Sequence, residues 1–265
     1  MCATTSYFVW GILPIYWKWL DHVKASEILA NRIVWSFMFS LFLVLVQKKG
    51  PILLQVLKEF VHHRKQLYLL VSASFLISVN WFIFIWSITH GHVTETSLGY
   101  YINPLVSMLL GVVFLKEKLS GIQIVSFCFA SIGVLILTLG HGTFPFIAIS
   151  LALSFGLYGL FKKFIKLDAA VGLTFETLFV MPLALGYMIY LGMSGEGSIL
   201  FHSPGTNLLL IGAGIATALP LLLFSRGAQL IPLTLLGILQ YIAPTITLFL
   251  VIFLFREPFH LLQLA

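Results

Sequence analysis

Hydrophobic residues in this 265-residue chain occur in long runs that short polar segments separate. A membrane-spanning helix needs about 17–25 apolar residues. Runs that approach this length predict nine helices, at about 5–20, 26–46, 67–89, 94–115, 119–139, 144–162, 169–191, 206–225 and 233–255. The longest connector, about 47–66, is rich in Lys and Arg and predicts an amphipathic surface segment. The pattern therefore indicates an all-α integral membrane protein.

A short set of residues recurs 140 positions along the chain. The first copy is Tyr101, Ile102, Pro104 and Glu117, and the second is Tyr241, Ile242, Pro244 and Glu257. We therefore predict two related halves, 1–140 with five helices and 141–265 with four helices and the stub of a fifth. Because five is odd, the second half enters the membrane from the opposite side, which makes the halves inverted repeats. The expected fold has ten helices, and the chain ends at Ala265, a few residues into the tenth.

Composition agrees with a lipid-facing exterior. The chain is 60% hydrophobic and 9% charged, against about 45–50% and 25% in soluble domains. With the N-terminus in the cytoplasm, eleven Lys and Arg residues lie in inner loops and three in outer loops. That imbalance follows the positive-inside rule. It accounts for the formal net charge of +6 without a nucleic-acid partner.

Three stretches carry a resemblance to a known family. They are WGILPIYWK at 10–18, SLGYYINPL at 97–105 and QYI-x-P at 240–244. The chain resembles RarD-type proteins in the EamA branch of the drug/metabolite transporter superfamily. The resemblance implies a ten-helix carrier in the bacterial plasma membrane, with both termini inside, that exports small metabolites or drugs. The absent tenth helix departs from the pattern, and homo-oligomer formation is left open.

Two charged residues lie within predicted spans. Arg32 is about 9 Å from the outer end of its helix at 1.5 Å per residue, where a charge costs at least about 2.5–3.5 kcal/mol. It either reaches outward to the headgroups or belongs to a substrate pathway. In the alignment of the two halves, Glu176 matches Asn31, the sequence neighbour of Arg32. Because the second half is inverted, Glu176 and Arg32 are nevertheless about 10 Å apart along the membrane normal. We therefore expect two polar points on one axis without a direct ion pair, with Glu176 either a proton-coupling residue or a packed, protonated acid.

Aromatic and amide side chains complete the predicted pathway. The aromatic residues are Trp10, Tyr16, Trp81, Tyr101, Tyr158 and Tyr241, and the amides are Asn80, Asn103 and Gln240. Interfacial aromatic belts and interhelical hydrogen bonds are the alternative roles. Pro14, Pro104, Pro220 and Pro244 lie inside apolar runs, where each can kink its helix.

The predicted function is secondary transport by alternating access, with export of small metabolites or drug-like amphipathic compounds. Its partners are the lipid bilayer and a small-molecule substrate. An enzyme would need at least two polar groups that converge at one depth, and the polar positions are scattered. A non-transporting membrane subunit is the other alternative. No metal-ligand spacing or phosphate-cradling glycine motif is present, so no metal or cofactor is expected.

Overall fold

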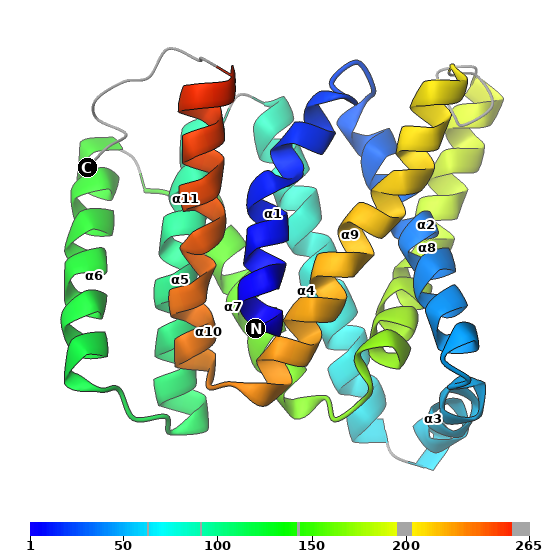
Figure 1. Cartoon of the computed structure of the whole chain (residues 1–265), viewed down its shortest axis with the longest axis horizontal. Coiled ribbons are helices and arrows are strands. Elements are labelled where there is room, and N and C mark those ends of the chain that lie inside the picture. The colour runs from blue at the N-terminus through cyan, green and yellow to red at the C-terminus, as the bar shows by residue number, and fades with distance from the viewer. Residues whose placement is uncertain (63, 91, 142–143, 195–202, 256–265) are drawn as a thin grey trace.

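The computed structural model describes residues 1–62, 64–90, 92–141, 144–194 and 203–255, and these residues form a bundle of helices (Figure 1). The first half contains α1 (Cys2–Lys18), α2 (Ala25–Val46), α3 (Gly50–His62), α4 (Arg64–Thr89), α5 (Val93–Leu115) and α6 (Gly121–His141). The second contains α7 (Phe146–Phe164), α8 (Ala169–Ser194), α9 (Pro204–Leu230), α10 (Leu233–Gln240), α11 (Ile242–Phe249) and the π-helical turn η1 (Leu250–Phe255). The predicted boundary at 140/141 falls at the end of α6.

Within the described residues, six helices are long and apolar enough to cross a membrane. They include segments of α2, α4, α5, α7, α8 and α9, and the apolar stretches Gly121–Ile136 and Leu233–Phe249 are shorter. The all-helical prediction is confirmed. The predicted surface segment 47–66 contains α3, which buries Val56 and Phe60 while Leu54 and Leu57 remain exposed.

Local chemistry sets several helix ends. Ser203 caps α9, because its hydroxyl accepts a hydrogen bond from the Thr206 amide at 3.3 Å and Pro204 at the first position needs no acceptor. Lys116 ends α5 in the left-handed conformation, with φ of 56°. The regular hydrogen-bond pattern of the predicted helix 233–255 is interrupted at Tyr241, although the backbone there stays right-handed helical with φ −62° and ψ −18°. Pro244 lacks the N–H that would reach the Gln240 carbonyl, so the broken hydrogen bond lies at this joint.

The other predicted kink positions differ from Pro244. Pro14, Pro104 and Pro220 lie inside the continuous helices α1, α5 and α9. Pro182 inside α8 is a fourth internal proline, which the sequence argument did not select. Pro104 and Pro244 correspond in the repeat, yet only the second lies beside a break.

Contacts between the helices of the two halves occur in reciprocal pairs. α1 corresponds to α7, α2 to α8, α4 to α9, and α5 to α10 and α11. The contact of α5 with α7 is therefore matched by that of α1 with α11, and the contact of α2 with α9 by that of α4 with α8. The contact of α4 with α7 is matched by that of α1 with α9. Two further pairs, α2 with α8 and α5 with α10, join corresponding helices directly. In Figure 1 the α1–α2 connection lies at the top and the α7–α8 connection at the bottom, so corresponding helices run in opposite directions.

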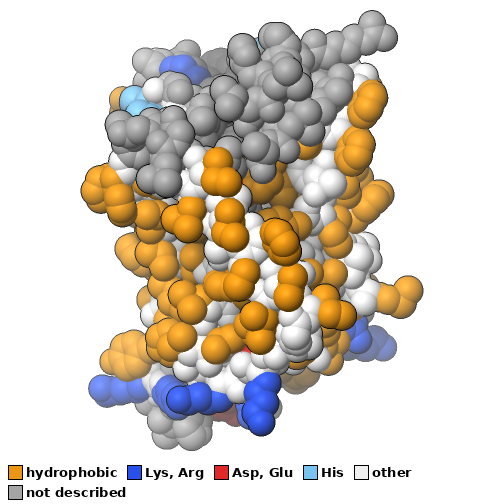
Figure 2. Space-filling model, turned by 90° about the vertical axis from the view of Figure 1, so that its left-hand side faces the viewer, with side chains coloured by type: hydrophobic (Ala, Val, Ile, Leu, Met, Phe, Trp, Pro, Cys, Tyr) orange, Lys and Arg blue, Asp and Glu red, His pale blue; other side chains and the backbone are white. Residues whose placement is uncertain are grey.

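The outer surface carries an apolar band with basic residues at one end. On the face that presents α6, hydrophobic side chains cover the middle of the molecule, and Lys and Arg side chains gather below them (Figure 2). Ile122 and Phe129 of α6 are 82% and 73% exposed. Such a band suits contact with lipid acyl chains, which are as apolar as these side chains.

Candidate functional site

A buried ion pair joins α7 to α8. The Lys162 Nζ atom lies 2.5 Å from Glu176 Oε1, and each side chain is 2% exposed. The Tyr158 hydroxyl donates a hydrogen bond of 3.1 Å to the other carboxylate oxygen of Glu176. Tyr158 and Lys162 are four residues apart, so they share one face of α7. The two carboxyl oxygens of Glu176 thus each have a partner on α7, one in Lys162 and the other in Tyr158.

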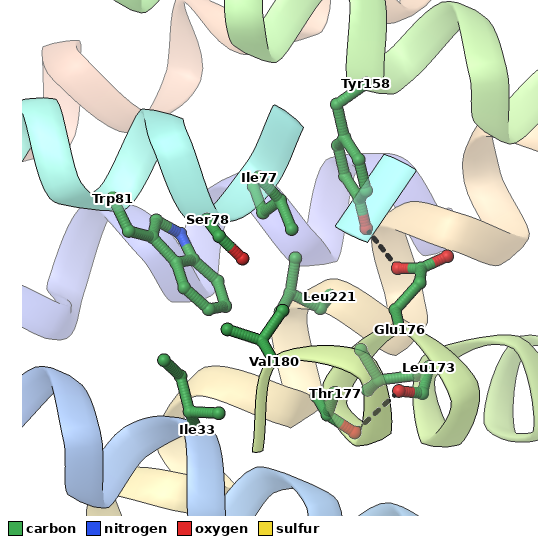
Figure 3. A pocket seen from close by; sticks show the side chains of 10 residues that line it. All are labelled: Ile33, Ile77, Ser78, Trp81, Tyr158, Leu173, Glu176, Thr177, Val180 and Leu221. Atoms are coloured by element: carbon green, nitrogen blue, oxygen red, sulfur yellow. Dashed lines mark hydrogen bonds between the residues drawn. The ribbon is translucent and has the colours of Figure 1, made fainter. Parts of the chain in front are cut away.

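A small cavity lies beside this cluster (Figure 3). Its volume is about 10 Å³, roughly the room that one water molecule needs. Five helices contribute to its wall: α2, α4, α7, α8 and α9. The lining residues are Ile33, Ile77, Ser78, Trp81, Tyr158, Leu173, Glu176, Thr177, Val180 and Leu221. The side chains of Ser78, Tyr158 and Glu176 thus meet mainly apolar side chains around a narrow space.

Arg32 lies in a second polar cluster, towards the opposite end of the bundle. Its Nε donates a hydrogen bond of 2.8 Å to the Thr217 hydroxyl of α9. The Arg32 Cζ atom lies 4.7 Å from the centroid of the Trp17 ring and 5.2 Å from that of Trp81. Both distances are within the range for cation–π attraction. Trp81 also lines the cavity, so this ring connects the Arg32 cluster to the wall beside Glu176.

Arg32 and Glu176 lie at equal distances from the starts of two corresponding helices. Each lies seven residues after the first residue of its helix, Ala25 in α2 and Ala169 in α8. Because the helices are antiparallel, each charge lies about 10 Å from its own end of the bundle. Among the described residues, the ion pair of Glu176 is with Lys162 and Arg32 has none. The expected arrangement of two polar points without a direct bridge matches this geometry.

Two of the three predicted amides, Asn80 and Gln240, bond to other helices, and none of the three lines the cavity. Asn80 donates from Nδ2 to the Leu151 carbonyl and to the Ser154 hydroxyl, both at 2.9 Å. Gln240 donates from Nε2 to the Ser107 hydroxyl at 3.0 Å. These bonds tie α4 to α7 and α10 to α5. The Oδ1 atom of Asn103 and the Oε1 atom of Gln240 are buried without a hydrogen-bond partner in the described structure.

The remaining predicted aromatic residues lie outside the cavity lining. Trp10 packs against Phe155 and Phe224, with ring centroids 5.9 and 5.7 Å away. Tyr16 donates to the Leu209 carbonyl. The Tyr241 hydroxyl donates to the Tyr101 carbonyl at 3.4 Å, between the two copies of the repeated motif. Of the predicted pathway residues, Trp81, Tyr158 and Glu176 therefore line the cavity, and Arg32 touches it through Trp81.

The sequence analysis does not predict two of the contacts between helices, those of Lys162 and Glu117. Lys162 is the last residue of the predicted span 144–162, and it is 1% exposed. Its spacing of four from Tyr158 was the available signal. Glu117, a member of the repeated set, accepts hydrogen bonds from the Leu233 and Thr234 amides at 2.7 and 2.8 Å. It thereby holds the end of α5 against the start of α10. Glu257, the matching residue of the second copy, lies outside the described residues.

A more exposed ion pair links the connector after α2 to the start of α8. Lys49 Nζ lies 2.5 Å from Asp168 Oδ2, with the two side chains 28% and 33% exposed. Partial burial alone would raise the pKa of Asp168. The hydrogen bond and charge of Lys49, together with the Ala170 and Val171 amides, outweigh it, and the pKa of Asp168 is lowered from its ordinary value.

Comparison with known proteins gives consistent matches. A model of the EamA-like transporter family matches residues 1–139. The uncharacterized transporter YojE of Bacillus subtilis is 50% identical over 257 residues, 97% of this chain and 85% of that protein. Protein RarD of Escherichia coli is 37% identical over 257 residues, 97% and 86% of the two chains.

A further relative and a solved structure extend the comparison. The chloramphenicol-sensitive protein RarD of Pseudomonas aeruginosa is 32% identical over 252 residues, which cover 95% of this chain and 84% of that protein. A crystal structure with 18% sequence identity aligns with a TM-score of 0.72 over 99% of this chain and 90% of its own. At that identity the likeness concerns the fold alone.

Proposed function

The chain belongs to the EamA-like transporter family, and we propose that it is a secondary carrier that exports small metabolites or drug-like amphipathic compounds by alternating access. Its homologues are transporters rather than enzymes. In the proposal the substrate moves along the interface between residues 1–140 and 141–265. The finer architecture we propose is nine spans in two inverted bundles of the ten-helix type.

The observation that carries the proposal is the reciprocal packing of antiparallel helices around a narrow, mainly apolar cavity beside Glu176. Helices from both halves, α2 and α4 with α7, α8 and α9, line the space next to Glu176. A volume of about 10 Å³ is too small for a metabolite, so we assign this conformation to a closed stage of the cycle. Inverted repeats can exchange their tilts about such a central site and expose it to one side at a time.

Charge placement supports the direction of insertion that we propose. The connector after α2, the ends of α5 and α7 and the start of α10 lie at the end where Lys and Arg gather (Figures 1 and 2). By the positive-inside rule this end faces the cytoplasm of a bacterial cell, with the N-terminus on the same side. Arg32 then lies in the outer half of the membrane and the Lys162–Glu176 pair in the inner half.

The test is a comparison of cells with and without the protein. A panel of antibiotics and metabolites that includes chloramphenicol, which a relative's name mentions, should show altered sensitivity or efflux for at least one compound. Everted vesicles and proteoliposomes, each with and without a pH gradient, then measure the flux directly. Correct insertion is checked by cysteine labelling from each side. A correctly inserted protein that changes the flux of no compound would contradict the proposal and favour a non-transporting role.

A further inference from the structure

We propose that Arg32 binds the anionic group of the substrate, so that the carrier's substrates are small organic anions, carboxylates above all, with a planar apolar body. This inference rests on the proposed transport function and adds the chemical class of its substrate. It starts from a charge that lies within a membrane span and is not neutralised by an ion pair in the described part of the chain.

The described residues around Arg32 hold the guanidinium in place without an anionic partner. Thr217 accepts from Nε, and the Trp17 and Trp81 rings lie against the guanidinium. Glu27 lies five residues earlier in α2, about 140° around the helix at 3.6 residues per turn, and its backbone carbonyl bonds to Asn31. The contacts that the described structure gives this cation are thus with neutral groups.

The terminal nitrogens of Arg32 remain available for a ligand. Nε is the atom that donates to Thr217, and no described residue accepts from the two Nη atoms. Arg32 as a whole residue is half-buried. A guanidinium with this end free presents two parallel N–H donors, the geometry that binds both oxygens of a carboxylate. Nε is occupied, so the ligand approaches at the Nη end.

The neighbouring side chains favour an apolar, planar body. Trp17, Trp81 and the half-exposed Tyr100 lie near the guanidinium on α1, α4 and α5. Aromatic faces of this kind stack on flat ligands. Because Trp81 also lines the cavity, a body bound beside Arg32 extends towards the interface of the two halves. The carboxylate of Glu176 at the far wall is already paired with Lys162, so its charge does not exclude an anion.

The experiment measures binding, which needs no transport. Protein in nanodiscs is dialysed against radiolabelled acids and their amides, matched in shape: phenylacetate with phenylacetamide, indole-3-acetate with indole-3-acetamide, and 1-naphthylacetate with 1-naphthylacetamide. We expect at least one acid to bind about tenfold or more tightly than its amide, since a hydrogen-bonded charge pair is worth that much. Arg32→Gln should remove the preference, and Arg32→Lys, which keeps the charge but loses the fork, should retain part of it.

Arg226→Gln is the matched control, because Arg226 is exposed near the basic end of α9; it should bind like the wild type. If no acid in the panel binds better than its amide to the wild type, the proposal is overturned, whether or not the variants fold. A preference that persists in a folded Arg32→Gln protein overturns it as well. Anion binding without flux in proteoliposomes would leave Arg32 as an anion site and count against the transport function separately.

Discussion

Removal of one partner from the Lys162–Glu176 pair should destabilise the protein strongly. Both side chains are 2% exposed, and their charged atoms are 2.5 Å apart. Lys162→Met would leave the Glu176 carboxylate with the Tyr158 hydroxyl as its remaining hydrogen-bond donor in the described structure. An unpaired buried charge costs about 3–5 kcal/mol, whereas loss of both charges is often nearly neutral. We therefore expect Lys162→Met to lower the unfolding free energy by about 3–5 kcal/mol.

A double-mutant cycle tests the origin of this loss. The unfolding free energy is measured by denaturing-detergent titration in bicelles for the wild type, Lys162→Met, Glu176→Gln and the double variant. The double variant should recover most of the loss, with a coupling energy above about 2 kcal/mol, because the amide introduced by Glu176→Gln still accepts from Tyr158 while no charge is stranded. Lys166→Met, at an exposed lysine four residues further along the chain, is the control. Additive effects, or a loss in Lys162→Met no larger than in Lys166→Met, would refute the reasoning.

Three further predictions concern the helix contacts and the exposed ion pair. Gly214→Ala should destabilise the protein by about 1–3 kcal/mol, the usual cost of overpacking, because the added Cβ would overlap Trp35 of α2. Gly186→Ala is the control, because its Cβ would meet no atom within 4 Å, and it should be neutral or mildly stabilising. Thermal unfolding measures the stability of both variants. Glu117→Ala should lower the unfolding free energy by about 1–2 kcal/mol, because the amides at the start of α10 lose their acceptor. Glu59→Ala on α3 is the control and should leave the unfolding free energy unchanged. Equal thermal midpoints for the two variants would show that Glu117 does not cap α10. The pKa of Asp168 is lowered in the folded state, so the pair with Lys49 stabilises the protein above the ordinary pKa of about 4 and this contribution disappears as the pH falls through the lowered value. A thermal midpoint measured from pH 6 to pH 3 should therefore fall more in the wild type than in Asp168→Asn, and parallel curves would contradict the prediction.

Hydropathy alone located most of the helices, because each span is encoded in its own contiguous residues. The predicted range 26–46 corresponds to α2 (Ala25–Val46), and 94–115 to α5 (Val93–Leu115). The break at Tyr241 was missed, since an apolar run contains no hydropathy signal for a lost backbone hydrogen bond. Pro244 was a candidate for that break, but Pro104 at the matching position lies within a continuous helix.

The polar contacts were less predictable, because their partners come from other helices. Lys162 lies at the edge of an apolar run, where a lysine usually extends to water, and only the position of Glu176 on α8 shows that it is paired. The separation of Arg32 from Glu176 was predictable, because inversion of the repeat fixes depth without any knowledge of side-chain contacts. Thr217 as the partner of Arg32 required the packing of α2 on α9.

The repeated Tyr-Ile-x-Pro sequence has two shapes within one molecule, unbroken in α5 and jointed between α10 and α11. The same proline is thus accommodated within a helix in the first half and lies beside an interruption of the helical hydrogen bonds in the second, where the Tyr241 backbone stays right-handed helical with φ −62° and ψ −18°. In the alternating-access cycle that we propose, the two halves exchange conformations, so the interruption would pass from Tyr241 to Tyr101. A cross-link that fixes the joint at Tyr241 should therefore hold the protein facing one compartment, and one that stiffens α5 near Pro104 should not.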